Sequence, residues 1–249
     1  MKTSLSITLT ILVCLYEASC FDFGKSFKLC HPSDPQIEKC LIDAIETGFK
    51  TLGSTGISAI GVAPIDPLEV VKITIGAGTS AVNLVQNYAN VKIKGLSTLK
   101  AESANFDLNN RNFVFVTRHP MLTQSADYSI NGKILVMPVF GKGLSVIKLK
   151  DAKIVHNIVF NEETKHNKKY FNVVSYNANI TIGGAHYDFQ NLFNGDRRLG
   201  DAILKVVNDN WSLIFNDVSE GVCKSYSQVF QSVATALFKR VPIEDMLHD

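Results

Sequence analysis

The stretch RRLGDAILKVVNDNWSLIFNDVSEGVCKSYSQVFQSVATALFK, residues 197–239, decides the fold of this protein. It contains no proline, and apolar residues recur through it at helical spacing from Leu199 to Leu237. A continuous helix of this length would be about 65 Å long, which is more than the width of a small globular domain. The stretch therefore predicts a long helix around which the rest of the chain must wrap.

The apolar stripe of this predicted helix rotates along its length. The stripe is centred near Leu199, Val206 and Leu213 at one end and has turned by more than a quarter turn at Tyr226. This drift indicates a helix that supercoils or kinks near Gly221, so that its two ends bury different faces. A sheet that coils around the helix satisfies the pattern, whereas a coiled coil between two chains would need strict heptads that are absent here.

Alternating apolar residues fill the middle of the chain, from Val70 to about Phe189, with the period of half-buried strands. Turn sequences separate them: LNNRN begins at Leu108, NG at residues 131–132 predicts a tight hairpin, and NEETKHNKK at residues 161–169 predicts a solvated hairpin loop. Short turns join antiparallel strands, so we predict an α+β fold with an antiparallel sheet. The alternating residues are Val71, Ile73, Ile75, Val91, Ile93, Phe106, Leu108, Phe113, Phe115, Tyr128, Ile130, Tyr176, Ala178, Ile180 and Ile182.

A shorter helix is predicted before the strands, from Ser33 to Leu52, with Ser33 and Gln36 resembling a capping box and Gly53 as the stop signal. Cys30 and Cys40 lie ten residues apart across the start of this helix. This short spacing allows them to pair without threading the long helix, so we predict a Cys30–Cys40 disulfide. Cys223 is then left as a free, packed thiol.

The first 20 residues have the pattern of a secretory signal peptide: a positive Lys2, an apolar run over residues 5–16, and small residues at Ala18 and Cys20. The predicted organisation is a signal peptide over residues 1–20 and a single domain over residues 21–249. The competing interpretation is an uncleaved membrane anchor. A transmembrane helix needs roughly 20 apolar residues, and no segment reaches that length, so we expect no stable insertion into a membrane.

The charge of the chain argues against a nucleic-acid partner. The formal net charge is +2 for the whole sequence, and it stays +2 without the signal, which holds one cation, Lys2, and one anion, Glu17. No large basic field therefore remains to bind nucleic acid.

The segment KITIGAGTSAVNLV, residues 72–85, contains a Gly-x-Gly-x-x-Ala run after a β-branched stretch, as a dinucleotide-binding loop would. Such a loop requires alternating strands and helices and an acidic residue at the end of the next strand. Glu102 falls well beyond that strand, and the chain that follows predicts antiparallel strands. We therefore interpret Gly76 and Gly78 as part of a turn between two strands.

Motifs for catalysis and metal binding are missing from the sequence. It has no His-Glu-x-x-His, Gly-x-Ser-x-Gly or Cys-x-x-Cys, and its histidines lack metal-ligand spacing. The Ser-x-x-Lys matches at residues 97–100 and 145–148 lie in predicted strands or turns, where the two side chains point to opposite faces. We expect no enzymatic activity, no cofactor and no metal site.

Five segments follow one another along the chain: KLCHPSDPQIEKCLIDAI (28–45), PIDPLEVVKITI (64–75), VKIKGLSTL (91–99), HPMLTQSADYSINGKILVMPVFGKG (119–143) and NLFNGDRRLGDAILKVVNDNW (191–211). Together they resemble the takeout and juvenile-hormone-binding protein family of insects, within the tubular lipid-binding superfamily. This resemblance implies a strongly curved antiparallel sheet around the long C-terminal helix, with an apolar tunnel between them. Juvenile-hormone-binding proteins proper have a second disulfide that reaches the long helix, and Cys223 has no partner for one, so the chain is more similar to the takeout branch.

The resemblance implies a secreted, monomeric carrier for a small elongated apolar ligand, such as a terpenoid, a juvenile-hormone-like or a fatty-acid-like molecule. The alternative is a secreted interaction protein whose interior is packed shut and whose partner is a protein or receptor. The sequence leaves both open, because a lined cavity and a filled core use the same residues. Candidate tunnel-lining residues are Val206, Asn210, Leu213 and Ile214 from the helix, and Ile73, Ile75, Phe113 and Phe115 from the strands.

Two sequons are present, Asn179-Ile-Thr and Asn210-Trp-Ser. Asn210 lies between Val206 and Leu213 on the predicted buried stripe, so we expect its amide to meet an internal partner or line the cavity. Asn179 is therefore the predicted glycosylation site.

Overall fold

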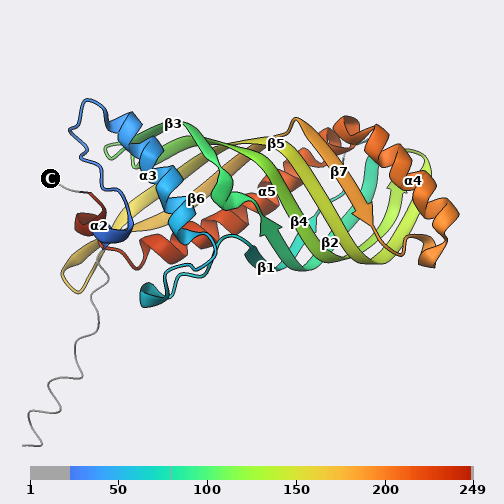
Figure 1. Ribbon diagram of the computed structural model, residues 1–249, viewed down its shortest axis with the longest axis horizontal. Helices are drawn as coiled ribbons and strands as arrows, with labels where there is room; N and C mark the ends of the chain where they lie inside the picture. The colour runs from blue at the N-terminus through green and yellow to red at the C-terminus, as the bar shows by residue number, and fades with distance from the viewer. Residues whose placement is uncertain (1–22, 79, 248–249) are drawn as a thin grey trace, which may run out of the picture.

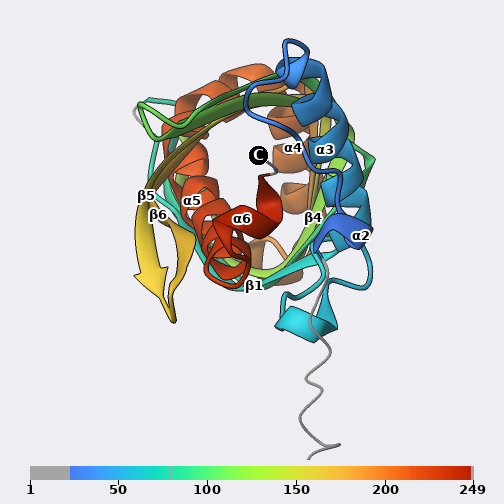
Figure 2. The same cartoon turned by 90° about the vertical axis from the view of Figure 1, so that its left-hand side faces the viewer.

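The computed structural model of this protein describes residues 23–78 and 80–247 (Figure 1). An antiparallel sheet curves along the molecule, and a long C-terminal helix lies against it (Figure 1). Seen along the long axis, the strands and this helix surround a common centre (Figure 2). The predicted signal peptide, residues 1–20, lies outside the described residues.

The described residues form one sheet of seven strands, in which every pairing is antiparallel, as predicted. The main path runs β1-β2-β4-β5-β6, with β3 paired to β4 and β7 paired to β5. The two edges of this path are therefore β1 and β6. The strands are β1 (Leu68–Ile75), β2 (Val82–Lys94), β3 (Lys100–Asp107), β4 (Asn112–Ile134), β5 (Met137–Lys165), β6 (Lys168–Thr181) and β7 (Gly184–Phe189).

In the two longest strands, β4 and β5, the inward-facing residues change from odd-numbered to even-numbered positions near the middle of the strand. Pro120 of β4 and Asp151 of β5 interrupt an otherwise regular pairing, and Asp151 has a left-handed φ of 48°. His119 and Leu122 are both buried although they are three positions apart. The register of the pairing is the same on both sides of this point, so both strands exchange their inward and outward faces together.

The predicted hairpins are correct in one case and need correction in two. The LNNRN segment does form the turn between β3 and β4. The prediction of a turn at Asn131-Gly132 is wrong, because these residues lie within β4 and pair with β2 on one side and β5 on the other. The turn between β4 and β5 lies at Leu135 and Val136. The 161–169 segment forms a hairpin, but most of it is paired strand and only residues 166–167 make the turn.

The helices are α2 (Phe23–Ser26), α3 (Ile37–Leu52), α4 (Arg197–Asp209), α5 (Trp211–Phe238) and α6 (Ile243–Met246). Short 3-10 turns lie at η1 (Ser58–Ile60), η2 (Leu96–Thr98) and η3 (Phe193–Gly195). Helix α3 ends at Leu52, directly before the predicted stop at Gly53, but begins at Ile37, later than the predicted start at Ser33. The backbone N–H of Gln36 donates to the Asp34 carboxylate, so a turn precedes the helix and Ser33 does not cap it.

The long C-terminal helix is interrupted at Asn210, and the predicted kink near Gly221 is wrong. Asn210 has non-helical angles and its Nδ2 donates to the carbonyl of Val206, 2.8 Å away. Gly221 lies inside α5, where a Cβ would come 3.2 Å from the Cγ2 of Ile75, so the glycine permits a close approach of helix and strand. The predicted stripe is shifted as well: the buried residues are Ile203, Val207 and Ile214, whereas Leu199 and Leu213 are each 50% exposed.

Helix α5 spans the gap between the two edge strands. The Ser225 hydroxyl donates to the Thr74 carbonyl of β1, and the Ser227 hydroxyl accepts from the backbone N–H of Ala178 in β6. A free backbone group on each strand edge is thereby satisfied by a helix side chain. The sheet and α5 together close a tube.

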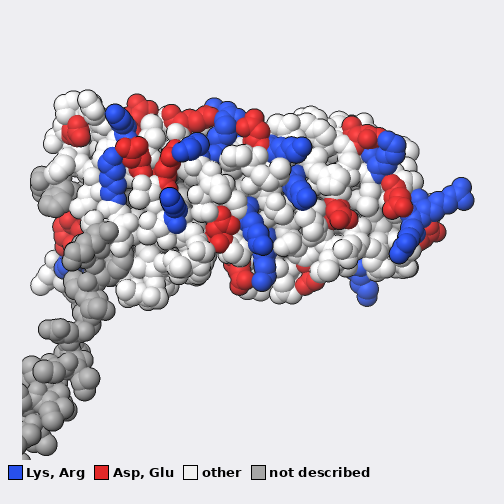
Figure 3. All heavy atoms as spheres, in the orientation of Figure 1, with Lys and Arg blue, Asp and Glu red and all other residues white. Residues whose placement is uncertain are grey.

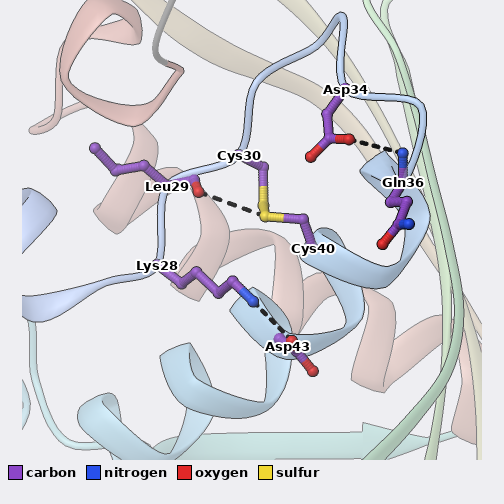
Figure 4. The surroundings of a disulfide bond; sticks show 7 residues. All are labelled: Lys28, Leu29, Cys30, Asp34, Gln36, Cys40 and Asp43. Atoms are coloured by element: carbon purple, nitrogen blue, oxygen red, sulfur yellow. Dashed lines mark hydrogen bonds and ion pairs between the residues drawn. A yellow bond between two sulfur atoms is a disulfide. The ribbon is translucent and has the colours of Figure 1, made fainter.

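The predicted disulfide is confirmed. Cys30 and Cys40 are bonded and tie the N-terminal arm to the first turn of α3 (Figure 4). Lys28 forms an ion pair with Asp43 beside this bond, with Nζ and Oδ2 2.7 Å apart. Cys223 is a free thiol, as predicted, and its half-buried sulfur accepts the backbone N–H of Ile180 at 3.3 Å.

Candidate functional site

In the part of the chain that the structure describes, apolar cavities lie along the tube between its helices and the inner face of the sheet, and three of them matter for the site. The end cavity, of about 210 Å³, lies at the α2 and α6 end. The middle cavity, of about 50 Å³, lies against α5, and the α4 cavity, of about 40 Å³, lies against α4 and the start of α5. Strand β4 passes all three in order, since Phe113 lines the end cavity, Leu122 the middle one and Ile130 the α4 cavity.

The end cavity is walled mainly by aromatic rings that pack on one another. Phe106 stacks on Phe160 with ring centroids 5.4 Å apart and meets Phe113 and Phe171 edge-on. Such mutual contacts hold the rings in place without a ligand. The apolar lining includes Phe23, Phe27, Leu41, Ile45, Phe49, Leu52, Phe106, Phe113, Ile158, Phe160, Phe171, Leu237, Phe238 and Leu247.

Segments from both ends of the described chain cover this cavity. Helices α2 and α6 lie at the same end of the tube in both views (Figures 1 and 2). Cys30 and Leu247 form a parallel bridge and both line the cavity. The disulfide joins this covering layer to α3, which lies against β3.

The middle and α4 cavities are adjacent, since Gln86, Tyr187 and Val218 line both. The lining of the middle cavity contains no charged residue. Burial raises the pKa of Tyr88 and of Tyr226, so both phenols stay neutral. The interior of the tube is therefore uncharged at these two cavities.

Four buried polar residues, Thr117, His119, His156 and Tyr176, lie between the end and middle cavities, and we call them the polar partition. Strand β5 shows this order directly, because Ile154 lines the middle cavity, Ile158 lines the end cavity and His156 lies between them. The Thr117 hydroxyl is 2.8 Å from His156 Nε2 and 3.1 Å from His119 Nε2. His156 Nδ1 is 2.7 Å from the Tyr176 hydroxyl.

One proton arrangement satisfies every member of the partition. The Gly95 carbonyl, 3.5 Å from His119 Nδ1, can only accept, so His119 Nδ1 donates and its Nε2 accepts from Thr117. The Thr117 oxygen then accepts from His156 Nε2, and His156 Nδ1 accepts from the Tyr176 hydroxyl. Burial lowers the pKa of His119 to about 4 and that of His156 to about 3, so both rings are neutral at pH 7.

The structure places only some of the predicted lining residues at these cavities. Ile75 lines the middle cavity, Ile214 the α4 cavity and Phe113 the end cavity. Phe115 is buried but stacks on His156, with centroids 4.3 Å apart, and Ile73 lines an outer groove between β1 and α5.

The three other helix candidates do not line the cavities. Val206 is half-buried, and Asn210 and Leu213 are exposed, so the prediction that these two face inward is wrong. The interruption at Asn210 changes the face that each half of the helix buries. The expected reason for excluding Asn210 as a glycan acceptor is therefore wrong as well, while Asn179 is exposed on β6 as expected.

Sequence reasoning missed the aromatic residues Phe160, Phe171 and Phe238 of the end cavity, and it missed Gln124 and Tyr226 of the middle one. Alternation in the strands marks inward-facing residues, and helical spacing marks Tyr226. Neither signal tells which inward side chains border empty space.

Outside these cavities, we find no charged patch or metal-ligand cluster in the described chain that would form a second binding site. Lys and Arg alternate with Asp and Glu over the face drawn in Figure 3. Within residues 23–78 and 80–247, no three His, Cys, Asp or Glu side chains gather as metal ligands. No helix in these same ranges is long and apolar enough to cross a bilayer.

An antiparallel sheet closed by a long helix, with apolar cavities between them, defines a tubular α+β protein. Residues 8–248 match the family described as haemolymph juvenile hormone binding protein (JHBP), and the chain belongs to this family. The resemblance to takeout and juvenile-hormone-binding proteins is thereby confirmed, and this family consists of binding proteins.

Relatives and solved structures agree with this membership. The chain is 27% identical over 235 residues to the circadian clock-controlled protein daywake of Drosophila melanogaster, covering 90% of this chain and 87% of that protein. It is 25% identical over 223 residues to daywake of Drosophila yakuba, covering 84% of each. The crystal structure of Epiphyas postvittana Takeout 1 matches with a TM-score of 0.78 at 22% identity, over 89% of this chain and 100% of that one, which shows a common fold.

Proposed function

We propose that this protein is a secreted, monomeric carrier that holds one small elongated apolar molecule, such as a terpenoid, juvenile-hormone-like or fatty-acid-like compound. The observation that carries the proposal is the end cavity, about 210 Å³ in volume and walled by apolar side chains of the sheet and the helices. An extended lipid chain gains several kcal/mol in such a site, at about 25 cal/mol per Å² of apolar area removed from water. No cofactor, metal or catalytic step enters the proposal.

Secretion is supported by two observations. The family is described as a haemolymph family, and the Cys30–Cys40 disulfide suits an oxidising compartment. Mass spectrometry of the protein from its own tissue would test export, because a mature chain beginning near Phe21 is expected. Sedimentation of the same material would test the monomeric state.

The alternative of an interaction protein with a closed interior also has one observation in its favour. The middle and α4 cavities are only about 50 and 40 Å³, so much of the tube is filled by side chains. The volume of the end cavity favours the carrier, since a closed core at native density leaves few voids larger than a water molecule.

The test fills the end cavity with a side chain. Ile158 is 3% exposed and lines this cavity, so Ile158→Trp places an indole where the ligand would lie. We expect the variant to bind the fluorescent probe N-phenyl-1-naphthylamine at least about tenfold more weakly than the wild type, a loss of about 1.4 kcal/mol. Titration of the probe fluorescence measures this affinity.

A matched control is Val174→Trp, because Val174 is 53% exposed on β6 and its side chain lies outside the tube. The control should bind the probe like the wild type. A wild-type protein that binds no apolar probe, or an Ile158→Trp variant with unchanged affinity and an intact fold by circular dichroism, would contradict the carrier and favour the interaction protein.

A further inference from the structure

The wall of the middle cavity contains a buried amide with unused hydrogen-bonding capacity. Gln124 of β4 is only 6% exposed and lines this cavity. Its Oε1 accepts a short hydrogen bond from the hydroxyl of Tyr226 on α5, which lines the cavity as well. Its Nε2 has no partner in the part of the chain that the structure describes.

Gln124 differs in this respect from the other polar side chains of the interior. The Tyr88 hydroxyl donates to Gln86 at 2.8 Å, and the Tyr128 hydroxyl donates to the Gln190 carbonyl at 2.6 Å. The four residues of the polar partition are satisfied by one another and by the Gly95 carbonyl. The other buried unpaired atoms in the described chain are amide oxygens of Asn112, Asn157 and Asn161, and these residues line none of the three cavities.

The orientation of this amide follows from the number of groups that it satisfies. If the Gln124 amide were reversed, its nitrogen would donate to the Tyr226 oxygen, but Oε1 would lack a donor, and the Tyr226 proton and the second amide proton would lack acceptors. The orientation in which Tyr226 donates to Oε1 leaves fewer groups unsatisfied, so Nε2 is the atom with unused hydrogen-bonding capacity. A buried donor without an acceptor is costly, and pockets for apolar ligands use a few such groups to orient what they bind.

The surroundings define the chemistry of the missing acceptor. No lysine, arginine or histidine lines the middle cavity, so a carboxylate there would be a buried charge without a counter-ion. A neutral oxygen, as in an ester, ketone, epoxide or ether, accepts from Nε2 without this penalty. Pure hydrocarbons leave the donor unsatisfied.

We infer that the middle cavity is a recognition subsite for a neutral oxygen on an otherwise apolar ligand, with the Nε2 of Gln124 as the donor and Tyr226 as the residue that positions the amide. The inference rests on the proposed carrier function and narrows its ligand to uncharged oxygenated molecules. Free fatty-acid anions and plain alkanes are the disfavoured classes.

The test compares methyl undecanoate with tetradecane on the mature full-length protein, through displacement of N-phenyl-1-naphthylamine. Gln124→Met keeps an unbranched side chain of similar length and removes the donor. We expect this variant to bind the ester about 3- to 10-fold more weakly than the wild type, as the loss of one hydrogen bond predicts, with tetradecane affinity unchanged. The control is Gln228→Met, the same substitution at an exposed position of α5.

A second measurement reports the hydrogen bond itself. The infrared band of methyl undecanoate labelled with ¹³C at its carbonyl should shift to lower wavenumber in the wild type and in Gln228→Met, and should return to its apolar-solvent position in Gln124→Met. If Gln124→Met folds poorly because Tyr226 loses its acceptor, the double variant Gln124→Met with Tyr226→Phe removes both polar groups and takes its place. Undecanoate at pH 8 should displace the probe less well than its methyl ester.

Three results would overturn the inference. These are an unshifted carbonyl band in the wild type, a shifted band that persists in Gln124→Met, and an undecanoate affinity above that of the ester. If tetradecane binds normally in those cases, the carrier function stands and only the subsite is lost. If neither tetradecane nor the ester binds the wild type, the carrier proposal fails and the subsite fails with it.

Discussion

The hydroxyl of Tyr176 lies 2.7 Å from Nδ1 of His156, and both groups are buried between the end and middle cavities. Because the hydroxyl donates to this nitrogen, His156 must stay neutral for the bond to persist. The same holds for His119, whose Nε2 accepts from Thr117. The polar partition is therefore a pH-sensitive part of the core.

We expect the free energy of unfolding to fall as the pH drops from about 6.5 towards 4. Burial lowers the pKa of His119 to about 4 and that of His156 to about 3 in the folded protein, whereas an unfolded histidine titrates near 6.5. Between these values the unfolded chain binds more protons, so stability is lost with acid, by a few kcal/mol in total, and is nearly constant above pH 7. Urea unfolding followed from pH 7.5 to 4 measures the slope.

His156→Gln tests the origin of this slope, because glutamine can still donate to Thr117 but does not titrate. Its stability should vary less with pH than that of the wild type. His186→Gln, at an exposed position on β7, should leave the wild-type slope unchanged. Identical slopes for His156→Gln and the wild type would show that the acid sensitivity arises elsewhere.

The disulfide should contribute to both stability and ligand retention. Replacing Cys30 and Cys40 by alanine should lower the free energy of unfolding by about 2–3 kcal/mol, as expected for a loop of this length. Because Cys30 also lines the end cavity, the variant should release N-phenyl-1-naphthylamine faster than the wild type in stopped-flow measurements. A reductant should destabilise the wild type and leave the double variant unaffected, and an equal effect on both would argue against this role.

The glycine-rich turn that resembles a nucleotide-binding loop binds a carboxylate of its own chain. Asp217 of α5 accepts the backbone N–H groups of Ser80, at 2.9 Å, and Val82, at 2.7 Å. A Cβ on Gly78 would lie 2.1 Å from Oδ2 of Asp217, whereas a Cβ on Gly76 would meet nothing within 4 Å. Gly78→Ala should therefore cost about 1–3 kcal/mol of stability.

Gly76→Ala is the matched control and should change stability by no more than about 0.5 kcal/mol. Thermal unfolding by circular dichroism compares the two variants. Equal melting temperatures for Gly76→Ala and Gly78→Ala would mean that the turn can move away from Asp217 at little cost.

Glycosylation at Asn179 remains a prediction, and the structure extends it to Asn210, since both side chains are exposed. Asn179→Gln and Asn210→Gln, expressed in a secreting cell, should each remove the mass of one glycan in intact-mass spectrometry. A bare Asn179 beside an occupied Asn210 would reverse the prediction made from the sequence.

Local patterns in the sequence determined much of the architecture. Alternation marked the inward-facing residues of most strands, for example Ile73 and Ile75 in β1, because a half-buried strand leaves a period of two whatever its neighbours are. Val71 of the same predicted series is wrong, since it is 86% exposed. The ten-residue spacing of Cys30 and Cys40 predicted their bond correctly, since a short loop closes at low entropic cost. The length of the proline-free stretch predicted that a helix runs along the tube.

Features that depend on long-range contacts came only from the tertiary structure. The hairpin turn lies at Leu135 and Val136 because β2 pairs with the residues before it, and this pairing outweighs the local preference of Asn131-Gly132 for a turn. Gly78 packs against Asp217, which lies far away in sequence, so the glycine pattern alone gave no sign of its partner.

The cavities show this limit most clearly. The same apolar side chains can fill a core or line an empty space, and the difference depends on how far apart the backbones of sheet and helix are held. The sequence by itself predicted a long helix against an antiparallel sheet, and it predicted a secreted chain with one disulfide. Only the tertiary structure decided that the helix is interrupted at Asn210, that Phe113 and Ile158 border the end cavity, and that Gln124 keeps an unused donor in the wall of the middle cavity.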